Sequence, residues 1–268
     1  MRFRFYISVL CLLFVNGIQA QDFGYSKSEN DSIVSFTFYN KLPIPVTLTV
    51  NKRSDLEIPI PVKPLVCPPA DSLVGIISIP KTFINADPDF KASDHFGSSV
   101  SYGKQLDDSE IKEVLYELPF QNGKRYKIIQ AFGGKFSHSS DQSRYAIDFK
   151  IPIGDTIVAA RSGRVVSAIE HFTERGGREY RDKANQVVIY HDDGTLAFYV
   201  HLDKDGALVE VGDLVEAGQN IGIAGFTGFT TTPHLHFVVR NFRDAIPIQF
   251  KEKKNIGKRS GVWVKKAN

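Results

Sequence analysis

The sequence predicts an all-β protein built from two domains, and three observations support this. Apolar and polar residues alternate near the N-terminus, as in Val34-Ser35-Phe36-Thr37-Phe38, which is the period of a half-buried strand. Glycines divide residues 121–245 into short segments that are typical of strands joined by tight turns. That region contains no helical pattern of convincing length. The 268 residues are enough for two ordinary domains.

The first twenty residues are predicted to be a secretory signal peptide and not part of the fold. A short basic leader, Met1–Arg4, precedes an apolar run of eleven residues, Phe5–Val15. The run is too short to span a bilayer as a mature helix, and cleavage is expected after Ala20. A retained membrane anchor is the alternative. We therefore expect a periplasmic or extracellular protein without a stable membrane anchor after cleavage.

Charge and cysteine content exclude some classes of function. Removing residues 1–20 takes away Arg2 and Arg4, so Lys plus Arg falls from 33 to 31 against 30 Asp plus Glu. This near-neutral balance gives no support to a nucleic-acid partner. Cys67 is then the single cysteine, which excludes an internal disulfide and disfavours a thiol-based or Cys-rich zinc site.

Residues 21–117 are predicted to form an N-terminal β-rich domain that resembles a small β-sandwich. Strands are expected over residues 33–39, 46–51 and 73–79. The segment Asn40–Pro43 is typical of a turn, and Asp107–Tyr116 has brief helical spacing before the next domain. His95 stands alone and is expected to be structural. No group of residues in this domain indicates chemistry.

Residues 118–247 are predicted to form the second domain, a compact body of folded-over hairpins. Six of the seven histidines lie here. Residues 170–183, rich in Arg and Glu, are expected to form a long solvated loop. Residues 248–268 are expected to be a basic C-terminal tail.

His234 and His236 are the first candidate site residues. Two positions apart on a strand, they project from the same face, with backbones about 7 Å apart. A catalytic zinc site takes three protein ligands and leaves a fourth position for water. His138 and a carboxylate would complete such a set with one of the paired histidines. We prefer Asp148 to Asp141 because Asp148 enters a predicted strand, and rigid elements hold ligands more precisely than loops.

His201 is the candidate for a further histidine at the site. Asp193-Gly194 is a signal for a two-residue hairpin turn. If those residues are the turn centre, His201 pairs with Gln186 and is the site candidate, whereas His191 faces the other way and is structural. A longer turn would undo this parity argument.

These residues stand within a series of motifs that run in chain order. The motifs are Ser137-His138, Ala146-Ile147-Asp148-Phe149, Pro152-x-Gly154, Val158-Ala159-Ala160, Gly163-Arg164-Val165-Val166, Tyr199-Val200-His201-Leu202, Gly212-Asp213-x-Val215-x-Ala217-Gly218-Gln219, Gly225-x-Thr227-Gly228 and Pro233-His234-Leu235-His236-Phe237. In them the sequence resembles the lysostaphin-type, or LytM-like, zinc metallopeptidases, which cut peptidoglycan cross-bridges.

The resemblance implies a role for each candidate residue. His138, Asp148 and His236 correspond to the ligands of one zinc ion (Zn2+), and His201 and His234 correspond to two catalytic histidines that do not bind it. It also implies a compact β-sheet catalytic domain of the duplicated hybrid motif type, with a groove for an extended peptide. Nine residues separate His138 from Asp148, whereas many family members have three. This difference puts the expected shape of the loop between them in question more than the site itself.

The expected function is that of an exported zinc metallo-endopeptidase that hydrolyses amide bonds in peptidoglycan cross-links or stem peptides. The alternative is a zinc-retaining wall-binding or regulatory module that activates another wall hydrolase, although the five intact positions argue against it. A lipoyl-type or biotinyl-type carrier domain is disfavoured, because such domains need a lysine on an exposed hairpin, often beside a methionine, and the only methionine here is Met1. The bond cut and the oligomeric state stay open.

Overall fold

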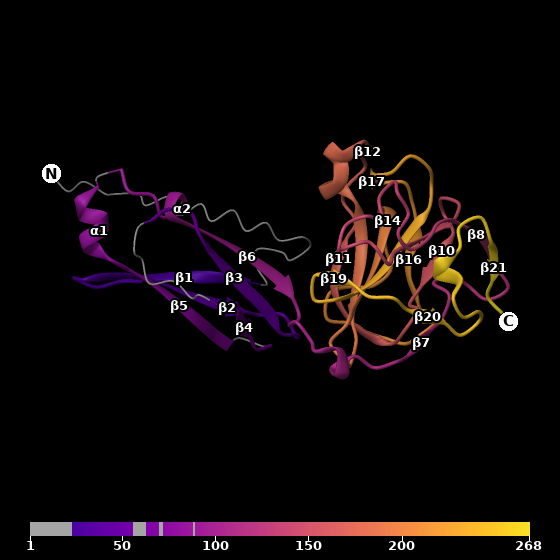
Figure 1. Ribbon diagram of the computed structural model, residues 1–268, viewed down its shortest axis with the longest axis horizontal. Helices are drawn as coiled ribbons and strands as arrows, with labels where there is room; N and C mark the ends of the chain where they lie inside the picture. The colour runs from indigo at the N-terminus through magenta and orange to yellow at the C-terminus, as the bar shows by residue number, and fades with distance from the viewer. Residues whose placement is uncertain (1–22, 56–62, 70–71, 88) are drawn as a thin grey trace. The chain divides into compact units, whose positions relative to one another are not determined.

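The structure, a computed structural model, describes residues 23–55, 63–69, 72–87 and 89–268. The described chain is nearly all β-structure and forms two compact units that divide between Lys104 and Gln105 (Figure 1). The predicted all-β fold class is confirmed. In the part of the chain that is described, no helix is long and apolar enough to cross a bilayer. The predicted signal peptide, residues 1–20, lies outside the described residues.

The first unit contains two three-stranded antiparallel sheets, ordered β1-β2-β5 and β4-β3-β6. Its elements are β1 (Phe23–Glu29), β2 (Ile33–Asn40), β3 (Val46–Lys52), β4 (Leu65–Cys67), β5 (Ser72–Pro80), α1 (Lys81–Ala86), α2 (Ala92–His95) and β6 (Phe96–Tyr102). Every second residue of β2 is buried, including Val34, Phe36 and Phe38, as the alternation of the sequence predicts.

The second unit is organised around an eleven-stranded sheet, whose main path is β15-β11-β13-β14-β18-β9-β8-β21. Its strands are β8 (Arg125–Gln130), β9 (Ile147–Lys150), β10 (Thr156–Val158), β11 (Gly163–Ile169), β13 (Asn185–Tyr190), β14 (Leu196–Ala207), β15 (Leu214–Val215), β16 (Asn220–Ala224), β18 (Leu235–Asn241), β19 (Asp244–Ala245) and β21 (Trp263–Lys265). Two short parallel pairs accompany it, β7 (Leu115–Tyr116) with β20 (Gln249–Phe250) and β12 (Arg175–Gly176) with β17 (Gly228–Phe229).

The apolar core of this unit lies on one face of the central strands. Its largest members include Phe149, Tyr199 and Phe237, each almost completely buried. The hydroxyl of Tyr199 accepts a hydrogen bond from the backbone N–H of Ala160 at 2.8 Å, so its one polar atom is satisfied inside the core. Because side chains alternate along a strand, the neighbours of these core residues project from the opposite face, where the candidate site lies.

Residues 105–117, which the sequence assigned to the first domain, form part of the second unit. Leu106 is buried, and its backbone N–H and carbonyl make two hydrogen bonds with the side chain of Asn241, of 3.0 and 2.9 Å. The predicted helical segment is reduced to the 3-10 turn η1 (Asp108–Glu110), after which the chain enters β7. The unit boundary differs from the prediction because these contacts join residues that are far apart in sequence.

Residues 248–268 also differ from the predicted tail. They contribute β20, the 3-10 turn η3 (Ile256–Lys258) and β21, which pairs with β8 at the edge of the large sheet. Val264 is buried, and the Lys266 ammonium donates to the carbonyl of Leu118 at 3.1 Å and pairs with Glu117 at 3.0 Å. Exposed and buried residues alternate around Val264, as is typical of an edge strand. The many lysines around it favoured the prediction of a basic tail instead.

Candidate metal centre

Two neighbouring strands place Asp148 and His236 directly opposite each other. In the antiparallel pair of β9 and β18, Asp148 is the register partner of His236. On the far side of β9, Gln130 of β8 is the partner of Asp148. Directly opposed residues project from the same face of a sheet, so these three side chains share one row. The apolar neighbours Phe149 and Phe237 then point into the core.

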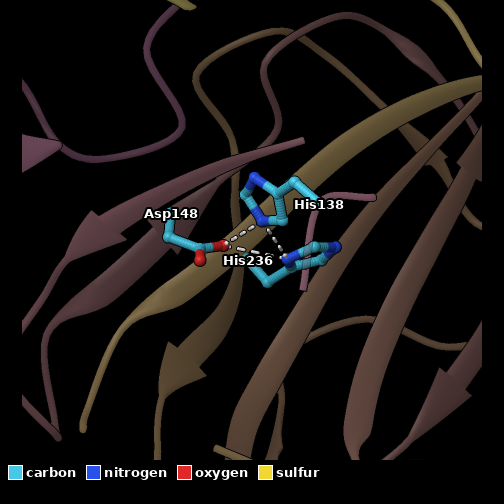
Figure 2. Close-up of side chains that lie close together, drawn as sticks. All are labelled: His138, Asp148 and His236. Carbon is cyan, nitrogen blue, oxygen red and sulfur yellow. Dashed lines mark hydrogen bonds and ion pairs between the residues drawn. The ribbon is translucent and has the colours of Figure 1, made fainter. Parts of the chain in front are cut away.

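His138 reaches this row from the loop between β8 and β9. A local turn, in which the His138 backbone N–H donates to the carbonyl of Gly134 at 2.9 Å, sets its position. Figure 2 shows the His138 and His236 rings converging on the Asp148 carboxylate. His138 Nε2 lies 3.1 Å from Asp148 Oδ1 and 3.3 Å from His236 Nδ1, and the last two atoms are 2.9 Å apart.

The donor set fits a zinc ion. The Nδ1 of His138 lies 2.9 Å from the carbonyl of Ala131 and must donate to it, so the Nε2 of the neutral ring is an acceptor. A carboxylate oxygen facing such acceptors is satisfied by a cation or a proton between them. Ligand atoms on a tetrahedral zinc ion lie about 3.3 Å from one another, close to the separations found here. Among the described residues, His138, Asp148 and His236 form the one group of three His, Cys, Asp or Glu side chains with this spacing.

The electrostatics of the cluster favour an ionised Asp148. Burial alone raises the pKa of this carboxyl, but its close contacts with the imidazoles of His138 and His236 outweigh burial and hold the pKa well below its usual range. Burial lowers the pKa of His236 despite its contact with Asp148. The shifts of Asp148 and His236 therefore favour an ionised carboxylate beside a neutral imidazole, which are the protonation states that bind a divalent cation.

His201 joins the site through a backbone irregularity, and the register predicted for it was wrong. The turn after β13 is longer than two residues, because Tyr190 pairs with Leu196, and Gln186 consequently pairs with Val200. In a regular strand His201 would then face away from the row of His236. Instead the register shifts at this point and His201 has a left-handed backbone, with φ 69°. Such a bulge re-aims a side chain.

The His201 ring lies beside both histidines of β18. Its centroid is 4.6 Å from that of His234 and 6.1 Å from that of His236. Its Nδ1 donates to the carbonyl of Thr227 at 2.7 Å, so its Nε2 is the free acceptor. Burial, reinforced by the neighbouring imidazoles, lowers the pKa of His201 to about 3.

His234 occupies the position just before β18. Its Nδ1 donates to the carbonyl of Thr232 at 2.7 Å, and its Nε2 lies 3.7 Å from Asp148 Oδ1. His234 and His201 thus share one arrangement, in which a backbone carbonyl fixes Nδ1 and leaves Nε2 able to accept a proton. The structure brings all five predicted site residues together.

The other residues weighed from the sequence lie elsewhere. Asp141, the rival carboxylate, is exposed and pairs with Arg144 at 2.8 Å. His95 bonds Ser54 at 2.7 Å in the first unit. His191 is fully buried in the turn after β13, where its Nδ1 donates to the carbonyl of Ser162 at 2.9 Å.

Gln130 is a site residue that the sequence did not indicate. Its amide nitrogen donates to Asp148 Oδ2 at 3.0 Å and to Ser137 Oγ at 2.7 Å. The bond holds the carboxylate so that the other oxygen, Oδ1, faces His138 and His236. A glutamine at the end of a strand carries no signal by itself, and only its register opposite Asp148 reveals the role.

We expect the Gln130→Leu variant to bind zinc 10- to 100-fold more weakly than the wild type, since outer partners that orient a ligand have effects of about this size. Competition with a chromogenic chelator measures the affinity. The matched control is Gln142→Leu, which changes an exposed glutamine in the loop after His138. Equal affinities of the Gln130→Leu protein and the wild type would show that the carboxylate needs no such support.

His191 gives a separate expectation for stability against pH. Burial lowers the pKa of His191 to about 4 from an ordinary 6.5. Between these values the unfolded chain binds a proton that the folded chain does not, so stability is complete above pH 6.5 and falls as the pH drops toward 4. The lowered pKa of His191 contributes about 3 kcal/mol to the free energy of unfolding above pH 6.5.

In the His191→Asn variant we expect a smaller loss of unfolding free energy between about pH 7.5 and about pH 4.5 than in the wild type. Asparagine keeps a donor for the carbonyl of Ser162 and does not titrate. Urea denaturation at the two pH values measures the difference. A variant as acid-sensitive as the wild type would show that His191 is not the group responsible.

The second unit is thus an all-β domain with a His2Asp cluster beside two further buried histidines. Residues 142–248 match the model of Peptidase family M23, a span that includes Asp148, His201, His234 and His236 and begins just after His138. The resemblance to the lysostaphin-type peptidases that the motifs predicted is confirmed for this part of the chain.

Three relatives illustrate the match. Lysostaphin of Staphylococcus simulans is 37% identical over 124 residues, which cover 44% of this chain and 23% of that protein. Its solved catalytic domain is 28% identical, with a TM-score of 0.34, and the match covers 46% of this chain and 87% of that one. Peptidoglycan DD-endopeptidase ShyB of Vibrio cholerae is 40% identical over 96 residues, 35% of this chain and 20% of that protein.

The third relative is named as an activator of hydrolases and not as a peptidase. Murein hydrolase activator NlpD of Escherichia coli is 35% identical over 114 residues, 42% of this chain and 26% of that protein. The chain spans about a quarter of the length of these three curated relatives.

Proposed function

We propose that this chain is an exported zinc metallo-endopeptidase that hydrolyses amide bonds in peptidoglycan cross-links or stem peptides. The observation that carries the proposal is the convergence of His138, Asp148 and His236, with His201 and His234 beside them. The name of ShyB, a peptidoglycan DD-endopeptidase, supports the substrate class. Export rests on the signal peptide proposed for residues 1–20.

His138, Asp148 and His236 would hold one zinc ion. A bound zinc ion acts as a Lewis acid and lowers the pKa of water in such a site to about 7. Gln130 and the carbonyl of Ala131 keep two of the three ligands in orientation, through the 3.0 Å bond to Asp148 and the 2.9 Å bond from His138.

His201 and His234 would move the protons of the reaction. Each presents Nε2 as an acceptor because Nδ1 donates to a backbone carbonyl. Burial lowers the pKa of His201, so that ring is neutral at pH 7 and presents an unprotonated Nε2 to the attacking water. Ring positions fixed by backbone carbonyls need no reorganisation during the reaction.

Incubation of the purified protein with peptidoglycan tests the proposal. We expect soluble cleaved peptides in the zinc-replete sample and none in a sample with a chelator, and mass analysis of the peptides identifies the bond. Equal release with and without the chelator would contradict a metallopeptidase.

A second candidate function is a zinc-retaining regulatory module that activates another wall hydrolase. The similarity to murein hydrolase activator NlpD favours it, although this chain keeps all five candidate residues. A regulator would release no peptide alone but would increase the release by an added wall hydrolase. Peptide release by the protein alone would support the metallo-endopeptidase and contradict the regulatory module.

A further inference from the structure

The strands at the C-terminal edge of the large sheet carry a group of cations around an exposed tryptophan. Lys127 of β8 is the register partner both of Lys150 in β9 and of Trp263 in β21. Arg125 of β8 is the partner of Lys265 in β21. We call these five residues the basic face. Figure 1 shows β8 and β21 side by side near the C-terminus.

The basic face belongs to the same sheet surface as the candidate metal centre. Asp148 and Lys150 lie two residues apart on β9 and therefore project from one side. The residues that point the other way, including Phe149, Tyr126 and Val264, are buried in the core. At about 3.3 Å per residue and about 4.8 Å per strand, the basic face begins roughly 7 Å from Asp148, at Lys150, and extends to roughly 16 Å, at Lys265.

Folding alone does not account for this arrangement. Lys127 opposite Lys150 and Arg125 opposite Lys265 are two like-charge pairs in direct cross-strand positions, which destabilise a sheet. Among the described residues, none of the four cations forms an ion pair. By contrast, their chain neighbours Lys124 and Lys266 pair with acids at 3.4 and 3.0 Å. Unpaired like charges held together in this way favour an anionic partner.

The exposed side chain of Trp263 indicates which kind of anionic partner fits the basic face. Its side chain is 53% exposed, and the Arg125 guanidinium lies over the indole, 5.0 Å from the ring centroid. The ring gives the basic face an apolar centre and holds one cation in place. A surface with both properties suits a peptide chain that carries carboxylates better than a small inorganic anion.

We propose that the basic face binds free carboxylates of peptidoglycan stem peptides while an amide bond of the same substrate lies at the metal centre. This rests on the proposed function and specifies the substrate as an acidic stem peptide. An extended peptide advances about 3.3 Å per residue, so carboxylates roughly two to five residues from the bond that is cut reach the cations.

Sedimentation of the full chain with purified peptidoglycan tests the proposal, with a chelator present to prevent hydrolysis. We expect the Lys127→Gln/Lys150→Gln variant to bind about 10-fold more weakly than the wild type at about 50 mM salt, and the difference to shrink at about 500 mM. The control is Lys112→Gln/Lys204→Gln, which removes the same charge from exposed lysines outside the basic face and should bind as the wild type does.

A second arm identifies the ligand chemistry. Amidation of the peptidoglycan carboxylates should weaken wild-type binding to the level of the Lys127→Gln/Lys150→Gln variant. Equal binding of that variant and the wild type, undiminished binding to amidated material, or binding to anionic phospholipid vesicles but not to peptidoglycan would each overturn the inference. Binding is scored apart from peptide release, so a protein that binds through the basic face and cleaves nothing refutes only the proposed function.

Discussion

Replacing His236 with alanine should remove both the zinc and the peptidase activity. In the proposed zinc site His236 supplies one of three ligand atoms, and its Nδ1 lies 2.9 Å from Asp148 Oδ1 and 3.3 Å from His138 Nε2. Without it, two ligands remain where a catalytic site needs three. We expect less than about a tenth of the wild-type zinc to survive purification, and peptide release to fall to the background.

The neighbouring variant His234→Ala separates binding from catalysis. His234 lies two residues away on the same face, but its Nε2 stays 3.7 Å from Asp148 Oδ1 and its Nδ1 is committed to the carbonyl of Thr232. This variant should keep its zinc and lose about 10²- to 10³-fold in turnover. Metal analysis of the two purified proteins measures the contrast. Equal zinc in the His236→Ala protein and the wild type would refute the ligand assignment.

The assembly of the metal cluster is the part that local sequence patterns anticipate best. The period of two places His234 and His236 on one face, and the alternating run around Asp148 places a carboxylate in a strand. Both patterns are local. The direct opposition of Asp148 to His236 is not, because it depends on how β9 and β18 align across nearly ninety residues of intervening chain.

Elements that depend on long-range pairing escape a local analysis. Gln130 becomes a partner of Asp148 only through the register of β8, and Val264 becomes a core residue only because β21 closes the sheet edge. Likewise, Leu106 joins the second unit through the side chain of Asn241. In each case the local pattern is weak, and tertiary contacts decide the outcome.

His201 reaches the other predicted site residues by a geometry different from the one predicted. A two-residue turn would have placed it opposite Gln186, but the longer turn gives that position to Val200. The bulge compensates for this shift, at the cost of a left-handed backbone in a residue other than glycine. Strain of this kind is retained at functional sites, so the irregularity itself indicates that the position of the ring matters.

We therefore expect His201→Ala to lower turnover by about 10²- to 10³-fold with an unchanged zinc content. The ring contacts no ligand atom within hydrogen-bond distance, but it lies against His234 in a tilted arrangement, with centroids 4.6 Å apart, and is oriented by Thr227. Removing it takes away a proton acceptor and leaves the three ligands in place. The effect should appear in kcat more than in KM, because His201 acts on the reacting groups and not on the extended substrate.

Steady-state kinetics with a soluble peptide and metal analysis of the same preparation measure the effect. His171→Ala is the matched control, since it removes an exposed histidine from the second unit and should leave both values unchanged. A second variant, His201→Gly, relieves the strain at φ 69° and should be equally inactive, which separates loss of the ring from backbone distortion. If either His201 variant retained wild-type kcat, the bulge would be only a feature of the fold, and His234 would remain the sole candidate for proton transfer among the five residues.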